Sequence, residues 1–232
     1  INSKTLLIGH SIMPLVITLA HQKGGVGKST LASNLRAYFS GGGYKTALVD
    51  IDPQGSLSKL SKSFAHQDGR EPEHVIDRND FKSYDELRER IEPYQIVIID
   101  TPPYLSKELE DVFALTNLIL IPCKTSPLDY LAIGDTLDLI SASKEKYPEL
   151  LAAIVLTMTI QGTDFTANIR NELQKTEFRV LDAEIGNRVA YMRSLLRSNS
   201  VEGDENRKAW QEITQLGDEI ISFMQAHYDH QK

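Results

Sequence analysis

The octapeptide Lys23-Gly24-Gly25-Val26-Gly27-Lys28-Ser29-Thr30 decides how the rest of the chain is interpreted. It joins an apolar run at residues 15–20, typical of a buried strand, to a helix expected over residues 29–40. Its three glycines let the backbone wrap around an anion, and free N–H groups and the positive end of the helix favour phosphate there. One position departs from the pattern G-x-x-x-x-G-K-[ST], because Gln22 stands where the first glycine would be. We predict a phosphate-binding loop rather than a glycine-rich turn with incidental lysines.

Three side chains of this loop are expected to make distinct contacts. Lys28 would reach the β- and γ-phosphates of a nucleotide. The Ser29 hydroxyl would join the ligands of a Mg²⁺ ion, and Thr30 would lie near the α-phosphate. The loop therefore predicts a nucleoside triphosphate with magnesium as its ligand.

Two further segments carry carboxylates where strands are expected to end. Asp50 and Asp52 lie in Asp50-Ile51-Asp52-Pro53-Gln54-Gly55, and Asp100 lies in Ile98-Ile99-Asp100-Thr101-Pro102-Pro103. In a parallel sheet the carboxyl ends of strands meet at one edge, so these residues should converge on the loop. Carboxylates beside a triphosphate need Mg²⁺ between them, so we expect Asp50 and Asp100 to hold the ion through water. Asp52 is expected to orient the attacking water; the alternative is that these aspartates only cap turns.

The remainder of the chain alternates apolar runs with helix-like segments. This pattern predicts one α/β domain with a mostly parallel sheet and helices on both faces. The expected strands are 15–20, 46–50, 95–100, 118–121 and 153–157, and the expected helices are 29–40, 84–91, 107–115, 128–146, 164–176 and 205–226. We interpret residues 62–92 as a variable surface insertion, and residues 1–12 as a leader or remnant before a single domain at 13–232.

The composition excludes several classes of protein. Of 232 residues, 41% are hydrophobic and 25% charged, as in an ordinary folded domain. A formal net charge of -7 excludes a uniformly basic coat for nucleic acid. The single cysteine, Cys123, excludes an internal disulfide framework and any cluster held by several thiolates, and we expect it to be buried. No run of about 18 uncharged apolar residues predicts a transmembrane helix.

The motifs KGGVGKST at 23–30, DIDPQG at 50–55 and IIDTPP at 98–103 resemble the ParA and MinD class of deviant Walker A P-loop ATPases. Within this class the chain looks most like the short ParA-type partition ATPases, and the resemblance extends over about residues 14–224. It implies that Lys23 crosses to the nucleotide of a partner subunit in an ATP-dependent homodimer. It also implies that Asp52 is critical for hydrolysis, and that turnover is slow and stimulated by an adaptor protein of the ParB type. Strand position adds Met158 to the expected nucleotide contacts.

A basic stretch suggests what such a dimer would bind. Residues 186–200 contain Arg188, Arg193 and Arg197 and no acidic residue. Arg193 and Arg197 are four positions apart, so they would share one face of a helix. Doubled by dimerisation, the cluster would neutralise phosphates of nonspecific DNA, and the resemblance implies DNA-contacting arginines in this region. The alternative is that these are ordinary surface arginines or contact the nucleotide.

Several functions are compatible with an ATP-dependent dimer of this kind. The main interpretation is a cytoplasmic, nucleoid-associated ATPase that segregates plasmid or chromosome DNA; the alternative is the positioning of a protein cargo, such as a chemoreceptor cluster or a microcompartment. A MinD-like membrane ATPase is disfavoured, because residues 205–232 carry three basic and five acidic residues. An iron–sulfur reductase is excluded by the single cysteine. An ATP-dependent metabolic ligase stays open, since sequence does not exclude an acceptor pocket.

Overall fold

A computed structural model of the chain describes residues 13–68, 75–104, 108–160, 164–195, 200–202 and 207–229. The expected leader at 1–12 and the candidate DNA contact Arg197 lie outside these residues.

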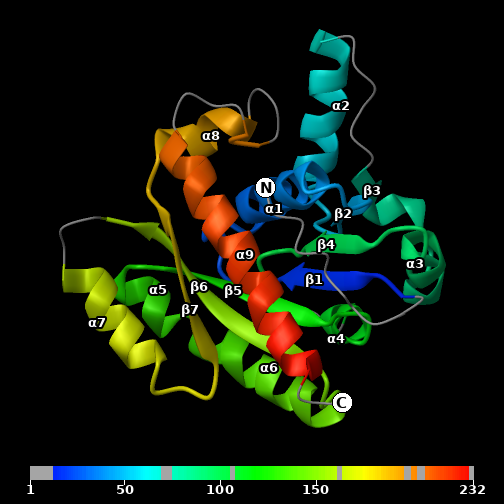
Figure 1. The fold of residues 1–232 in the computed structure, drawn as a ribbon. Coiled ribbons are helices and arrows are strands. Elements are labelled where there is room, and N and C mark those ends of the chain that lie inside the picture. The colour runs from blue at the N-terminus through cyan, green and yellow to red at the C-terminus, as the bar shows by residue number, and fades with distance from the viewer. Residues whose placement is uncertain are drawn as a thin grey trace.

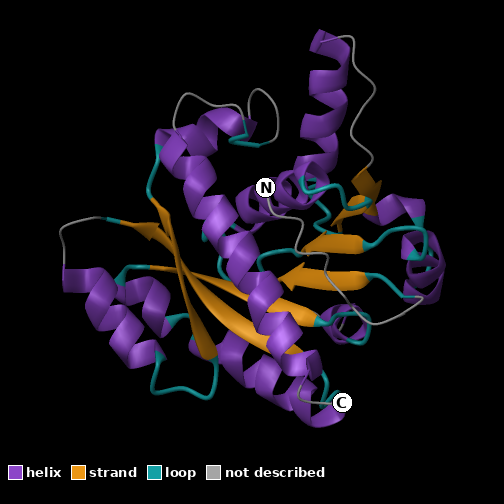
Figure 2. Cartoon of the chain, in the orientation of Figure 1, coloured by secondary structure: helices purple, strands orange, loops and turns teal. Residues whose placement is uncertain are grey.

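The described strands form one seven-stranded sheet in which each neighbouring pair is parallel. Their order is β3-β2-β4-β1-β5-β6-β7, with β1 at the centre (Figures 1 and 2). The strands are β1 (Leu15–Leu19), β2 (Thr46–Asp50), β3 (Val75–Asp77), β4 (Ile96–Asp100), β5 (Leu118–Lys124), β6 (Leu151–Thr159) and β7 (Arg179–Gly186). This is the α/β architecture of a P-loop fold that the sequence predicts.

Helices alternate with these strands along the chain. They are α1 (Lys28–Gly41), α2 (Ser56–Asp68), α3 (Tyr84–Ile91), α4 (Glu108–Phe113), α5 (Pro127–Leu131), α6 (Gly134–Lys146), α7 (Asp164–Leu173), α8 (Val189–Leu195) and α9 (Arg207–Asp229), with a short 3₁₀ turn at Arg78–Asp80. None of the helices in the described ranges has both the length and the apolar character needed to cross a membrane.

Strand β1 shows why the sheet is buried on both faces. Ile17 packs into the hydrophobic cluster under α1 and α9, whereas its neighbour Val16 packs into the cluster formed with α3. A strand with both faces covered must be apolar at successive positions, which produces the continuous apolar run in the sequence. Cys123, in β5, is buried in a third cluster beneath α6 and α7, as expected.

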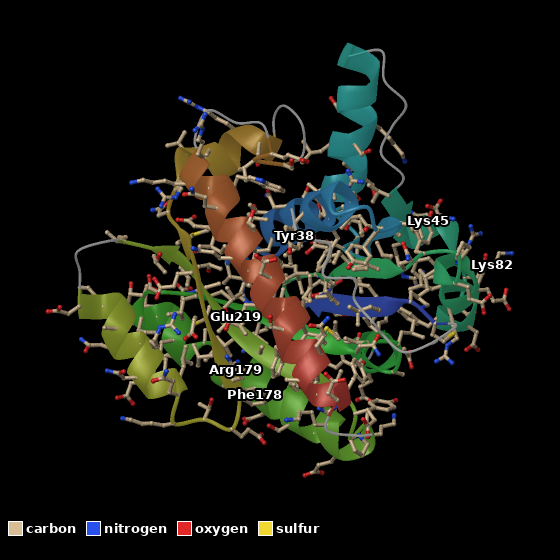
Figure 3. The ribbon with its side chains drawn as sticks, viewed as in Figure 1. Tyr38, Lys45, Lys82, Phe178, Arg179 and Glu219 are labelled. Atoms are coloured by element: carbon tan, nitrogen blue, oxygen red, sulfur yellow. The ribbon has the colours of Figure 1, made fainter. Side chains whose placement is uncertain are left out.

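Helix α9 closes the face that carries α1. Its apolar stripe, including Ile213, packs against the sheet and α1, so it is a core element. Tyr38 of α1, labelled in Figure 3, donates a hydrogen bond of 2.6 Å to Asp218 of α9. Oε1 of Glu219, in α9, lies 3.4 Å from Nη2 of Arg179, in β7. The Glu219 carboxylate also accepts hydrogen bonds from the backbone N–H groups of Asp182 and Ala183. Acidic side chains of α9 therefore cover backbone donors of strand β7 at the edge of the sheet.

Several features differ from the sequence-based expectations. The helix expected over 128–146 is divided into α5 and α6. Strands β3 and β7 and helices α2 and α8 were not predicted. The stretch 62–92 is not a simple surface insertion, because β3 joins the sheet and Phe81, Leu87 and Ile91 are buried. The buried residues of this stretch therefore extend the hydrophobic core.

Candidate functional site

The predicted phosphate-binding loop connects β1 to α1 at the carboxyl edge of the sheet. Gly25 and Gly27 have φ angles of 74° and 99°, in the left-handed region that favours glycine. Gly27 is also the N-cap residue of α1, and it provides no side-chain cap. The first N–H groups of α1 therefore have no capping oxygen from this residue and face the loop, which is the geometry of an anion site.

Lys28 lies over this loop. Its side chain is buried, and Nζ donates hydrogen bonds of 3.0 Å to the His21 carbonyl oxygen and 3.3 Å to the Lys23 carbonyl oxygen. Burial lowers the pKa of Lys28 from its ordinary value, while the charges of Asp100 and Asp52 oppose this shift. An anion bound in the loop would act in the same direction as these carboxylates and favour the charged lysine.

The carboxylates predicted at strand ends converge. Asp50 and Asp100 are partners in the register between β2 and β4, so they lie side by side. Asp100 is 1% exposed, and burial raises its pKa to about 7; the charge of Asp50 adds to this rise and a hydrogen bond with Ser29 opposes it. Oδ1 of Asp100 is buried without a hydrogen-bond partner. A buried carboxylate oxygen of this kind beside a serine hydroxyl fits a divalent cation.

Asp50 and Asp52 also have structural roles. Oδ2 of Asp50 accepts the N–H groups of Leu57 and Ser58 at 3.0 and 3.2 Å, and Oδ1 accepts that of Asp52 at 3.2 Å. Asp50 thus binds the first turn of α2, and burial raises its pKa despite these hydrogen bonds. Asp52 is half-buried and accepts the N–H of Gln54 at 2.9 Å. The turn-capping alternative therefore describes contacts of both residues, and their catalytic and metal roles stay predictions.

Side chains of the site are too few to hold a metal ion alone. Within the described ranges, no group of three or more His, Cys, Asp and Glu side chains is placed to bind one. Mg²⁺ commonly uses one or two carboxylates and completes its shell with phosphate and water. Ser29 and Asp100 are therefore the best-placed protein ligands for magnesium that accompanies a nucleotide.

A contact that the sequence did not predict joins Lys23 to Asp129. Lys23 forms an ion pair with this carboxylate, which lies in α5 of the same chain. Ser126 caps α5 and Pro127 opens it, so Asp129 is held at a fixed place. Lys23 therefore contacts its own protomer in this structure. The 106 positions that separate the two residues left no local signal of the pair.

His21 supports the same loop. Its Nδ1 accepts the N–H of Lys23 at 2.9 Å, and burial, together with the charge of Lys28, lowers its pKa to about 4. The imidazole is therefore neutral near pH 7. Met158, predicted to contact the nucleotide, has a φ of 52° at the end of β6. The adjacent Thr157 donates a hydrogen bond of 2.9 Å to the Val26 carbonyl oxygen, which ties this strand end to the loop.

A cavity of about 580 Å³ lies beyond Met158, between the ends of β6 and β7 and helix α9. Its wall includes Arg188 and Glu212, which are joined by a hydrogen bond of 2.8 Å from Nε. Glu212 also accepts the N–H of Gly186 and the hydroxyl of Tyr191. Of the predicted DNA contacts, Arg188 is thus engaged within the chain and Arg193 is exposed on α8.

Comparisons with known proteins agree with this geometry. The family model described as CobQ/CobB/MinD/ParA nucleotide binding domain matches residues 17–201. Maintenance of carboxysome distribution protein A from Halothiobacillus neapolitanus is 29% identical over 209 residues, 88% of this chain and 95% of that protein. Chromosome partitioning protein ParA from Myxococcus xanthus is 30% identical over 206 residues, 71% of each chain.

Two solved structures share the fold. A putative plasmid partition protein from Borrelia burgdorferi bound to AMPPNP has a TM-score of 0.68 at 21% identity, covering 90% of this chain and 99% of that one. Cobyrinic acid a,c-diamide synthase from Mycobacterium smegmatis, with bound ATP analogue and magnesium, has a TM-score of 0.68 at 19% identity over 88% and 93%. The glycine loop, the buried Lys28 and the family match lead to one conclusion: the chain belongs to the CobQ/CobB/MinD/ParA family of nucleotide-binding proteins.

Proposed function

We propose that the chain is a ParA-type ATPase that binds ATP with Mg²⁺, dimerises around the bound nucleotides, and in that state positions or segregates a cargo. The observation that carries this proposal is the convergence of Lys28, Ser29 and Asp100 around an uncapped helix start. The relatives solved with AMPPNP, and with an ATP analogue and magnesium, support the choice of ligand.

Each residue of the site has a part in the proposed hydrolysis. The loop 23–30 and Lys28 would bind the phosphates, while Ser29 and Asp100, and Asp50 through water, would hold Mg²⁺. When bound, this ion would neutralise phosphate charge in the transition state. Asp52, half-buried and within electrostatic reach of Lys28, would orient the water that attacks the terminal phosphate. Lys23 would reach the nucleotide of the second subunit.

Two variants test the nucleotide site. Lys28→Ala should abolish binding of a fluorescent ATP analogue, whereas Lys82→Ala, at an exposed lysine that precedes α3 (Figure 3), should not. Asp52→Ala should still bind ATP and should accumulate as a dimer, measured by size-exclusion chromatography with light scattering. Parental binding by Lys28→Ala, or a monomeric Asp52→Ala protein in ATP and Mg²⁺, contradicts the proposal.

We further propose that the ATP-bound dimer binds nonspecific DNA through α8 and the residues after it. Arg193 is exposed on α8 and precedes Arg197 by four positions, whereas Arg188 forms an ion pair with Glu212. Arg193→Glu with Arg197→Glu should reduce DNA retention in ATP and lower the slope of log K against log salt by about one per lost phosphate contact. ATP affinity should be unchanged, and Arg88→Glu on α3 is the matched control. DNA binding that is equal in ATP, in ADP and without nucleotide contradicts the proposal that the ATP-bound dimer binds DNA.

The cargo divides the proposal into two candidates. Plasmid or chromosome DNA, with an adaptor of the ParB type, is supported by the ParA relative. A protein assembly such as a microcompartment is supported by the carboxysome distribution relative, which aligns over 88% of this chain, more than the 71% of the ParA relative. Deleting the gene in its source cell and imaging both cargoes separates the candidates, because only the true cargo should lose its spacing.

A further inference from the structure

We infer that Asp129 is a positioning residue for Lys23, which it retains within its own protomer until a second copy of the chain and its nucleotide draw the lysine away. The inference rests on the proposed ATP-dependent dimer and adds a control on its formation. It assigns to α5 a part in the nucleotide site that neither the P-loop motif nor the family match indicates.

The first observation is the ion pair itself. The Asp129 side chain is 7% exposed and that of Lys23 is 39% exposed, so a nearly buried carboxylate holds a lysine that still borders solvent. Asp129 also accepts a hydrogen bond from the Ser126 hydroxyl. Burial alone would raise the pKa of Asp129, but Lys23 and Ser126 together lower it below its usual range. The carboxylate therefore stays ionised near pH 7 and attracts the lysine throughout the neutral range.

The second observation is how firmly the same segment holds the preceding residue. The backbone N–H of Gln22 donates to the Thr136 hydroxyl at 3.2 Å. The Gln22 side-chain amide donates to the Ala132 carbonyl oxygen at 3.1 Å and to Asp135 at 2.9 Å. The backbone before Lys23 is thus attached to the start of α6. Movement of Lys23 toward a second subunit must then be mainly a side-chain rotation away from Asp129.

These contacts have a thermodynamic consequence for the dimer. A contact that exists only in the monomer opposes dimerisation, because it must be broken in each of the two subunits. Once Lys23 leaves, Asp129 remains as a nearly buried charge, which adds to the opposition. Asp129→Asn retains the shape and removes the charge. We expect the dimer dissociation constant to fall about tenfold, or about 1.4 kcal/mol shared by two partly exposed pairs.

The experiment measures Lys23 and the dimer separately. In nucleotide-free protein, labelling of Lys23 by an amine-acylating reagent, followed by mass spectrometry, should increase in Asp129→Asn. In an Asp52→Ala background with ATP and Mg²⁺, analytical ultracentrifugation should show the tighter dimer. The matched control is Asp138→Asn, which removes the same charge at an exposed position of α6 and should leave both readings within about twofold of the parent. Asp129→Ser provides a second neutral variant if Asn at this position impairs folding.

The outcomes distinguish this inference from the proposed function. If the parent dimerises and Asp129→Asn dimerises equally or more weakly, Asp129 does not retain Lys23 against the dimer and the inference is overturned. Unchanged labelling of Lys23 also overturns it, because the pair would then not restrain the lysine. If neither protein dimerises with ATP although Lys23 labelling rises, the proposed dimer itself is wrong.

Discussion

Asp100→Asn should stabilise the nucleotide-free protein while removing a proposed magnesium ligand. The carboxyl is 1% exposed, and burial raises its pKa from 3.8 to about 7. The folded state therefore holds the proton more tightly than the unfolded chain does. Both states are protonated below about pH 4, so the carboxyl has no effect on stability there. As pH rises from about 4 to about 7, the carboxyl ionises in the unfolded state but not in the folded state. This ionisation stabilises the unfolded state, so the free energy of unfolding falls.

The size of the effect follows from the separation of the two pKa values. Integrated from pH 5 to pH 8, a carboxyl with pKa values of 3.8 unfolded and about 7 folded loses on the order of 2.5 kcal/mol of folding free energy. An asparagine does not titrate, so its advantage over Asp100 should increase by this amount across the range. Any constant cost of fitting the amide beside Ser29 cancels from this difference. The corresponding gain in Tm at pH 8, relative to pH 5, is about 5–10 °C.

Urea unfolding of both proteins at pH 5, 6, 7 and 8, in buffer with EDTA and without nucleotide, measures the change. Asp138→Asn, at an exposed carboxylate of α6, is the control and should show almost no pH-dependent advantage. The reasoning is refuted if the advantage of Asp100→Asn is constant across this range, or if it shrinks toward pH 8. Either result would mean that burial does not raise the pKa of Asp100 into this range.

Three other substitutions test the core, the loop and the edge of the sheet. Phe39→Ala empties a fully buried position of α1 and should cost about 3–5 kcal/mol in urea unfolding; a cost under about 1 kcal/mol contradicts the packing. Gly27→Ala places a side chain at φ 99° and should cost about 1–2 kcal/mol and weaken nucleotide binding, whereas Gly134→Ala, whose methyl also meets no atom within 4 Å, should be neutral or stabilising by thermal melt. Arg188→Ala should lower stability by about 1–3 kcal/mol and leave the salt slope of DNA binding unchanged. Arg193→Glu should leave stability unchanged and lower the salt slope. Equal salt slopes for both variants would contradict these separate roles.

The central strands and the loop could be predicted because burial and chemistry act locally there. Strand β1 is covered on both faces, so its residues are uniformly apolar and stand out from their surroundings. Glycines at 25 and 27 are required by left-handed backbone, and the lysine and serine that follow match the phosphate and magnesium contacts that we propose. These requirements act on consecutive residues, so they are visible in the local sequence. The fold class and the phosphate loop were therefore accessible from sequence.

Other parts depend on contacts between distant segments. Strand β7 carries Arg179, Asp182 and Glu184, which do not suggest a sheet until α9 is seen to cover its edge with Glu219. The short strand β3 has only three residues and lies within a strongly charged stretch. Likewise, Arg188 looked like a free basic residue, and only the fold brings Glu212 within 2.8 Å of it. No periodicity or spacing in the sequence encodes these pairings.

Burial disfavours the charged forms of two groups in the nucleotide site of the nucleotide-free protein. Burial shifts the pKa of Lys28 downward and that of Asp100 upward, so each group is held where its charged form is disfavoured. A phosphate beside Lys28 and a divalent cation beside Asp100 would reverse both shifts together. Lys23 differs, because Asp129 already satisfies its charge within the monomer. In the proposed cycle, nucleotide binding would relieve the first two groups in a single subunit, whereas moving Lys23 would require the partner subunit. Nucleotide binding and dimerisation would then be separate steps.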